Sequence, residues 1–334
     1  MLAKSWKVFF GVLSTSVQIR HGENHTSCDE DVDRIWAKAM PLTQTRIMSQ
    51  LSRRLPSSVQ HIELVLGVDP RSNNPTDMHI LLCDDSCTFM DISLYFHVDE
   101  HGEKYAYIGS AQVDPSLRGQ GLGRRMVANL VNLFSSMEVD GLEVFADGED
   151  GSHSWGRCGF DFNEDADSLS SFYEMIAERW AFLKSVIRLP ANTIDQVETL
   201  LEQPYSRCIQ DIAALNFNLA ASPLDDYVSP KQILLRYVEL LCKQQAKQEG
   251  YDDGDIKYDP LYMRETLSTL LSAQHHKLGT TLLRGLKWSG RIDFSDKRQL
   301  ERVLNYCDRR ETACVKHRPA MTLDQGVGVL ALSS

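Results

Sequence analysis

Three glycines two residues apart, Gly119, Gly121 and Gly123, form the stretch of this sequence best suited to holding a ligand. They follow the β-prone run 105–113 and Pro115, which cannot donate to a sheet ladder and so predicts the end of a strand. Beyond the turn, apolar residues recur at helical spacing. A helix N-terminus offers unpaired N–H groups and a partial positive charge, and glycine permits close approach of the backbone. The pattern therefore predicts a strand, an anion-binding turn and a helix.

Two common phosphate-binding loops do not fit this turn. A Walker loop has Lys and then Ser or Thr after its last glycine, whereas Gly123 is followed by Arg124 and Arg125. A G-x-G-x-x-G dinucleotide fingerprint that begins at Gly119 fails because its last glycine would be Arg124. A nucleotide-hydrolysing switch is therefore disfavoured.

The turn resembles the acyl-CoA loop of the GCN5-related N-acetyltransferases (GNAT). That family shows V-x-P followed by R/Q-x-x-G-x-G/A, and 113–115 (VDP) and 118–123 (RGQGLG) fill every fixed position. The resemblance implies an α/β (α+β) fold with a mixed sheet flanked by helices, and acetyl-CoA as cosubstrate without a metal. The residues that it places at the cosubstrate are Val113, Arg118, Gly119, Gln120, Gly121, Leu122, Gly123 and Arg124.

The resemblance also implies where acetyl transfer would occur. The pantetheine arm would run beside 111–113, with a backbone N–H near Val113 stabilising the oxyanion. The family commonly places a base on the central strand shortly before the valine, where this chain has Tyr107 and Gly109. Because neither is a carboxylate, we expect Glu103 to act as the base through a water molecule and Tyr107 to position the substrate. The structural alternatives are a turn charge at 103, a half-buried sheet tyrosine at 107, and at 109 either a strand irregularity or close packing.

The acid that would protonate the leaving thiolate is missing from its usual position. The family often shows a Tyr-x-x-x-Gly-Phe pattern, of which Gly159 and Phe160 are present while Trp155 replaces the tyrosine. An indole N–H donates hydrogen bonds but gives up no proton at neutral pH. The expected function is acetyl-CoA-dependent N-acyltransfer to an amine, on a protein lysine, an N-terminus or a small molecule. The alternative is a non-catalytic GNAT-fold binding or scaffold protein.

Two domains are expected in a chain of 334 residues. The first, 1–165, is predicted to hold the acetyl-CoA-binding fold, with the resemblance strongest over 60–162. The second, 166–334, shows helical periodicity and is predicted to be all-α, where it would select the acceptor or bind a protein partner. The individual elements predicted ahead of the turn are a strand at 7–18, helices at 31–40 and 42–55, and strands at 59–68, 79–83 and 88–98.

Charge and cysteine usage restrict the partners and the compartment. A net charge of −11 disfavours a nucleic-acid partner, and no apolar run is long enough to span a membrane. The eight cysteines are scattered without a Cys-x-x-Cys pair, which favours reduced thiols in the cytoplasm and no metal site. Cys307 lies on an apolar helix face and is predicted to be a core residue.

Overall fold

The computed structural model describes most of the chain, namely residues 14–21, 25–26, 29–69, 71–72, 74–84, 87–147, 151–163, 165–202, 209–219, 230–250 and 277–308. Residues 7–13 of the first predicted strand lie outside these ranges, as do residues 259–276 of a further helix that the sequence pattern predicts at 259–277. No described helix is long and apolar enough to cross a membrane.

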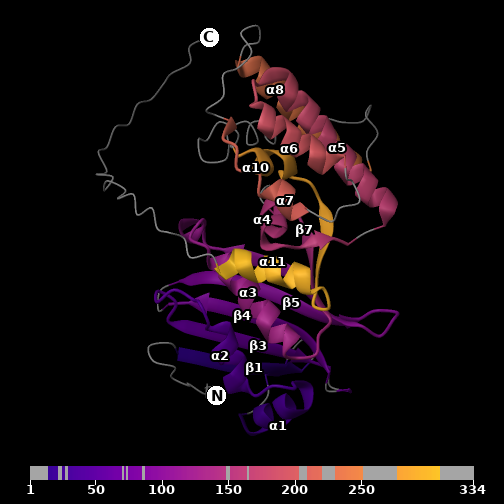
Figure 1. The fold of residues 1–334 in the computed structure, drawn as a ribbon. Coiled ribbons are helices and arrows are strands. Elements are labelled where there is room, and N and C mark those ends of the chain that lie inside the picture. The colour runs from indigo at the N-terminus through magenta and orange to yellow at the C-terminus, as the bar shows by residue number, and fades with distance from the viewer. Residues whose placement is uncertain are drawn as a thin grey trace, which may run out of the picture.

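A mixed sheet forms the lower half of the molecule in the view of Figure 1, and most of the later helices lie above it. Over the described residues it has nine strands in the order β2-β1-β3-β4-β5-β6-β7-β9-β8. The pairs β1–β3 and β6–β7 are parallel, and the other neighbours are antiparallel. This confirms the expected α/β fold class. The strands are β1 (Ser14–His21), β2 (His25–Thr26), β3 (His61–Val68), β4 (Pro75–Cys83), β5 (Thr88–Val98), β6 (Lys104–Val113), β7 (Gly141–Ala146), β8 (Asp161–Phe162) and β9 (Trp288–Asp293).

Helices pack on the sheet and form a separate layer beyond it. The described helices are α1 (Asp29–Ala39), α2 (Gln44–Leu51), α3 (Leu122–Ser135), α4 (Gly151–Cys158), α5 (Ala166–Val186), α6 (Ala191–Leu201), α7 (Ile209–Ala213), α8 (Pro230–Gln248), α10 (Leu278–Leu283) and α11 (Lys297–Asp308). Helix α2 is shorter than the predicted 42–55, because Thr43 caps its start and Arg54 adopts a positive φ of 63° after its end.

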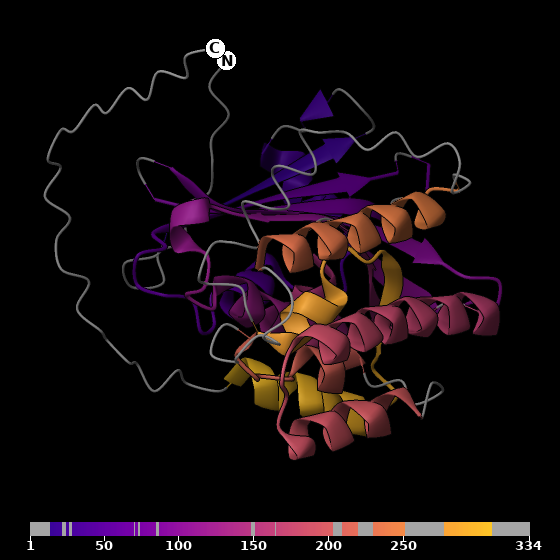
Figure 2. The ribbon, with the colours of Figure 1, turned by 90° about the horizontal axis from the view of Figure 1, so that it is seen from above.

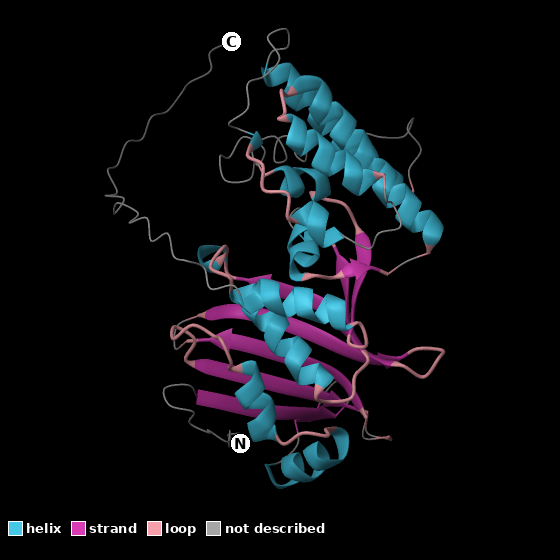
Figure 3. Ribbon diagram, in the orientation of Figure 1, coloured by secondary structure: helices cyan, strands magenta, loops and turns pink. Residues whose placement is uncertain are grey.

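The two faces of the sheet differ in chemistry because side chains alternate along each strand. The covered face bears buried apolar residues such as Leu94 and Ile108 and packs against α2 and α3 (Figure 3). The Asn129 amide of α3 donates to the carbonyl of Leu51 at 2.8 Å and so fixes the two helices to each other. The opposite face, which we call the open face, bears polar and aromatic side chains of β5, β6, β7 and β9, namely Tyr95, His97, Tyr105, Tyr107, Glu143 and Arg291.

The last strand enters the sheet from far along the chain. Strands β8 and β9 are antiparallel neighbours, yet residues 163–287 lie between them in the sequence, and the helices described in that range form the helical layer. Within that layer α5 and α8 pack side by side (Figures 1 and 2). The sequence analysis predicted only helices beyond residue 165, so strand β9 in this region corrects that prediction. The sheet therefore uses strands from both sides of the expected boundary.

The sequence of β9 explains its place between β7 and β8. Its alternate residues Trp288, Gly290 and Ile292 are buried on the covered face. Trp288 stacks on Phe162 of β8 with ring centroids 6.4 Å apart. A Cβ at position 290 would lie 2.5 Å from the Trp288 ring, so only glycine fits there.

Helix α11 follows β9 and returns to the first half of the chain. It packs against α3, α4 and β9 (Figure 1). Cys307 is 3% exposed, which confirms its predicted place in the core. Residues near the end of the described chain therefore lie beside the helix that follows the glycines.

Candidate active site

The glycine turn, residues 118–123, joins β6 to α3 as predicted. Gly119 and Gly121 have φ angles of +77° and +75°, a region that other residues rarely adopt. Gly121 immediately precedes α3, whose first-turn N–H groups have no partner within the helix. A Cβ at Gly123 would make only an ordinary contact, 4.0 Å from Val113. The turn therefore fits a phosphate, because backbone donors and the helix dipole converge at its end.

The polar side chains of the turn support its shape. Arg118 Nε donates to the carbonyl of Val113 at 3.2 Å, and Gln120 Nε2 donates to the carbonyl of Ser116 at 3.2 Å. Leu122 is buried and anchors the start of α3. Arg118 and Gln120 were expected at the cosubstrate, and these bonds give both a role in holding the backbone that would bind it.

Strands β6 and β7 part beside the glycine turn, and we call the end of their pairing, at Ile108 and Val144, the parting point. They pair only over 105–108 and 141–144, while β6 continues to Val113. The backbone N–H and C=O groups of 109–113 on that side therefore have no partner from β7. An extended chain such as a pantetheine arm can hydrogen-bond to such an edge.

Gly109 is the first residue of β6 beyond these pairs, and it lies in a bulge. Its neighbours Ile108 and Ser110 pair with consecutive residues of β5. A Cβ at Gly109 would lie 2.4 Å from the ring of Tyr95. The expected strand irregularity is confirmed, and close packing applies as well.

Tyr107 lies on the open face, one residue before the parting point. It is paired with Tyr95 on one side and Glu143 on the other. Burial raises the pKa of Tyr107, with Glu143 and Tyr95 adding to the effect. Its hydroxyl therefore stays protonated at neutral pH, which suits positioning and not proton removal.

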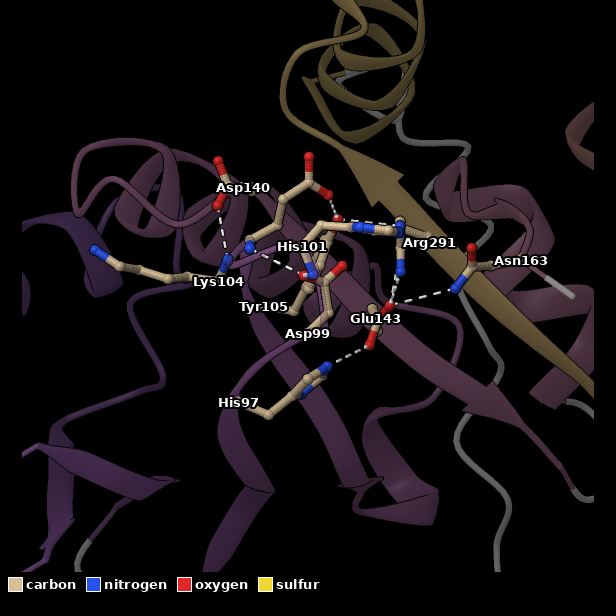
Figure 4. Close-up of polar contacts among 10 residues, drawn as sticks. His97, Asp99, His101, Lys104, Tyr105, Asp140, Glu143, Asn163 and Arg291 are labelled. Atoms are coloured by element: carbon tan, nitrogen blue, oxygen red, sulfur yellow. Dashed lines mark hydrogen bonds and ion pairs between the residues drawn. The ribbon is translucent and has the colours of Figure 1, made fainter.

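Glu143 is the centre of a polar cluster on the open face (Figure 4). Its side chain is 13% exposed and accepts from Arg291 Nη2 at 2.6 Å and Nε at 2.9 Å. Asn163 Nδ2 donates to the same oxygen at 3.3 Å. The other oxygen lies 3.2 Å from Nε2 of His97. The carboxylate of this β7 residue is thus held by one residue each from β5 and β9 and by the residue after β8.

Glu103, the expected base, lies farther from the parting point. Its carboxylate accepts a hydrogen bond from the hydroxyl of Tyr105. Burial and this hydrogen bond raise the pKa of Tyr105, while Arg291 lies 4.1 Å above the ring and donates to the hydroxyl at 3.1 Å. From Glu103 to Ile108 the strand rises roughly 16 Å. Its assignment as base stays a prediction that needs a relay.

On helix α4, Trp155 and His153 are both held by contacts with other parts of the molecule. Trp155 packs edge-to-face on Phe160 with centroids 5.3 Å apart. His153 Nε2 lies 3.1 Å from the carbonyl of Ala213 and 3.2 Å from Oγ1 of Thr280, so it joins α4 to the helical layer. Among the described residues, no three His, Cys, Asp or Glu side chains converge to hold a metal ion.

Helix α11 brings Tyr306 to the start of α3. The guanidinium carbons of Arg124 and Arg157 lie 5.6 Å and 5.1 Å from the centre of its ring. Burial raises the pKa of Tyr306, with the neighbouring Cys158 adding to the effect. Arg124, expected at the cosubstrate, is therefore oriented from the last described helix.

Sequence reasoning missed the open-face cluster and Tyr306. Glu143 had a signal, because it is the one carboxylate within the apolar strand run 142–146 and must face opposite Leu142 and Val144. His97, Arg291 and Tyr306 had none, because their roles depend on which strands and helices become neighbours.

The structure thus combines a mixed sheet, a parting of two parallel strands, a glycine turn and a helix, as the resemblance implied. Residues 89–160 match the model of the Acetyltransferase (GNAT) family, so the chain carries a GNAT acetyltransferase domain. This confirms the resemblance of the glycine turn. The segment matched runs from β5 to the end of α4 and contains the whole turn.

Solved structures give partial similarities. The structure of AtaTR bound with AcCoA is 22% identical over 27% of this chain and 62% of that chain, with a TM-score of 0.25. The KacTA–DNA complex is 22% identical over the same shares, with a TM-score of 0.24. The ribosomal-protein-S18-alanine N-acetyltransferase from Escherichia coli is 15% identical over 40% of this chain and 72% of that chain, with a TM-score of 0.22. This chain spans 60% of a mutant AtaT toxin, seen bound to the C-terminus of the antitoxin AtaR. No curated protein matches the sequence.

Proposed function

We propose that this protein transfers an acetyl group from acetyl-CoA to an amine. The observation that carries the proposal is the pair of left-handed glycines, Gly119 and Gly121, at the start of α3 and beside the point where β6 and β7 part. The amides of 119–124 would hold the pyrophosphate, and 111–113 would pair with the pantetheine arm. A backbone N–H near Val113 would stabilise the charge that develops on the thioester oxygen.

The reaction is the attack of a neutral amine on the thioester carbonyl carbon. A C–N bond forms, the C–S bond breaks, and the amine nitrogen loses a proton to a base. The thiolate of CoA takes a proton from water, because Trp155 offers none. Tyr107, with its proton retained, would orient the amine. Lysine side chains, protein N-termini and small amines all meet this requirement, and the helical layer would choose among them.

A non-catalytic scaffold is the second candidate, and Trp155 is the observation that favours it. Its ring is packed against Phe160 and provides no proton for the leaving thiolate. Such a protein would bind acyl-CoA through the same glycine turn.

The test is to measure CoA release and the mass of the product with the purified full chain, acetyl-CoA and three acceptors. These are a peptide with a free N-terminus, a lysine peptide with a blocked N-terminus, and a polyamine. We expect CoA release that depends on one acceptor and an acetyl mass added to it. Binding of acetyl-CoA in calorimetry without transfer to any amine would favour the scaffold.

A further inference from the structure

We propose that His97, held by Glu143, accepts the proton of the acceptor amine on the open face of the sheet. The proposal rests on the proposed acetyl transfer and replaces the relay from Glu103 with a nearer base. It also places the acceptor amine on the face opposite α3, whose N-terminus would hold the phosphates.

The first argument is the pairing of an exposed imidazole with a shielded carboxylate. The side chain of His97 is 43% exposed, whereas that of Glu143 is 13% exposed. Their Nε2 and Oε2 atoms are 3.2 Å apart. An ionised carboxylate only accepts hydrogen bonds, so Nε2 carries the hydrogen and Nδ1 is left as the basic nitrogen. A carboxylate behind a histidine fixes the tautomer and stabilises the imidazolium once it forms.

The second argument is that the carboxylate is itself fixed. Arg291 of β9 donates two hydrogen bonds to Glu143, and Asn163 donates a third. Arg291 also contacts Tyr105 of β6. The ring centroids of Tyr105 and His97 are 5.7 Å apart, and the two rings are tilted by 32°. The groups that face His97 are thus the carboxylate of Glu143, the guanidinium behind it and the protonated Tyr105. Glu143 and Arg291 carry opposite charges and form an ion pair behind the imidazole.

The third argument is location. Glu143 is paired with Tyr107 in the row next to the last one that joins β6 and β7. That row lies about 3 Å along the strand from the last pair, and His97, which is paired with Tyr105, lies about 10 Å from it, whereas Glu103 lies roughly 16 Å from it. Tyr95 and Tyr107 flank the same position on the open face. An amine that reaches the parting point from this face would lie nearer to the His97–Glu143 pair than to Glu103, with Glu143 between it and His97 and water molecules carrying the proton.

The proton balance of the step is simple. The acceptor reacts as the neutral amine, and as the C–N bond forms its nitrogen loses one proton, which passes to Nδ1 of His97 through water. Glu143 keeps its charge and stabilises the imidazolium. The proton later returns to solvent, while the released thiolate takes one from water.

The variant His97→Gln tests this assignment, with His101→Gln as the matched control. His101 lies on the same β5–β6 hairpin and is exposed, and its side chain lies 3.6 Å from the carboxylate of the neighbouring Glu100. We expect His97→Gln to lower kcat/KM on the order of 10²-fold and to remove the rise of rate with pH, while the affinity for CoA and the melting temperature stay unchanged. The control should match the wild type in all four measurements.

Glu143→Gln tests the positioning residue. We expect it to lower kcat and shift the pH–rate profile without changing KM for acetyl-CoA, which a merely structural role would not do. A His97→Gln enzyme with the wild-type rate across the pH range overturns the assignment of His97 but leaves the acetyl transfer standing. Absence of transfer by the wild type overturns both.

Discussion

The two faces of the sheet contribute to the site in different ways. On the covered face, the ligand would be held by backbone groups at the start of α3, and the side chain of Arg118 supports this backbone by donating to the carbonyl of Val113. On the open face, side chains themselves would act, and His97, Glu143 and Arg291 come from three different strands. Binding on the first face thus depends on local backbone shape, whereas chemistry on the second depends on long-range assembly of the sheet.

The largest expected effect is a loss of stability caused by a substitution on the covered face of β9. Trp288 is 0% exposed, so Trp288→Ala should lower the free energy of unfolding by about 3–5 kcal/mol through the lost burial and the cavity left behind. Phe145 lies on the neighbouring strand and opposite face and is 44% exposed. Phe145→Ala should cost less than about 0.5 kcal/mol. Denaturant unfolding measures both, and equal losses would contradict the difference between the faces.

The second effect concerns the backbone that would bind the phosphates. Gly121→Val places a β-branched residue at a φ of +75° and a Cβ 3.0 Å from Arg124, so the affinity for acetyl-CoA should fall roughly 10²-fold. Gly123→Ala is the control, because its φ is ordinary and its Cβ meets only Val113 at 4.0 Å. Calorimetry should find it within a few-fold of the wild type. Unchanged binding by Gly121→Val would mean that the turn is structural.

The smallest change in affinity is expected for a variant of α11, which tests whether this helix supports the glycine turn. Tyr306→Leu removes the ring on which Arg124 and Arg157 lie and should weaken acetyl-CoA binding about three- to tenfold. Tyr306→Phe keeps the ring and should retain the affinity. The same calorimetric titration would contradict this prediction if Tyr306→Leu bound acetyl-CoA more tightly than the wild type. That result would show that α11 obstructs the site.

The glycine turn was predictable because all its determinants lie within one short stretch. Pro115 ends the strand, the glycines provide the left-handed angles, and the apolar spacing starts the helix, so no distant contact is needed. The expected strands at 59–68 and 88–98 are close to the observed β3 and β5 for the same reason. Alternating burial within each strand already separates the two faces.

The open-face cluster was not predictable, because its geometry depends on which strands become neighbours. Glu143 and Arg291 are 148 residues apart in the chain and meet only because β9 lies beside β7. The β9 sequence is short and follows a long helical stretch, so its local pattern gave no reason to place it in this sheet. The base was therefore sought on β6 alone, where Glu103 is the nearest upstream carboxylate.

The late return of β9 also sets the order in which the site can form during synthesis. Residues 163–287 must leave the ribosome before β9 does, which takes roughly 6 to 25 s at the usual 5–20 residues per second. During that time the edge of β7 that β9 will occupy is open, and Glu143 lacks Arg291. The nascent chain then already has the glycine turn but neither the clamp on Glu143 nor the ring of Tyr306. Acetyl transfer would thus begin only when nearly the whole of the described chain has been made.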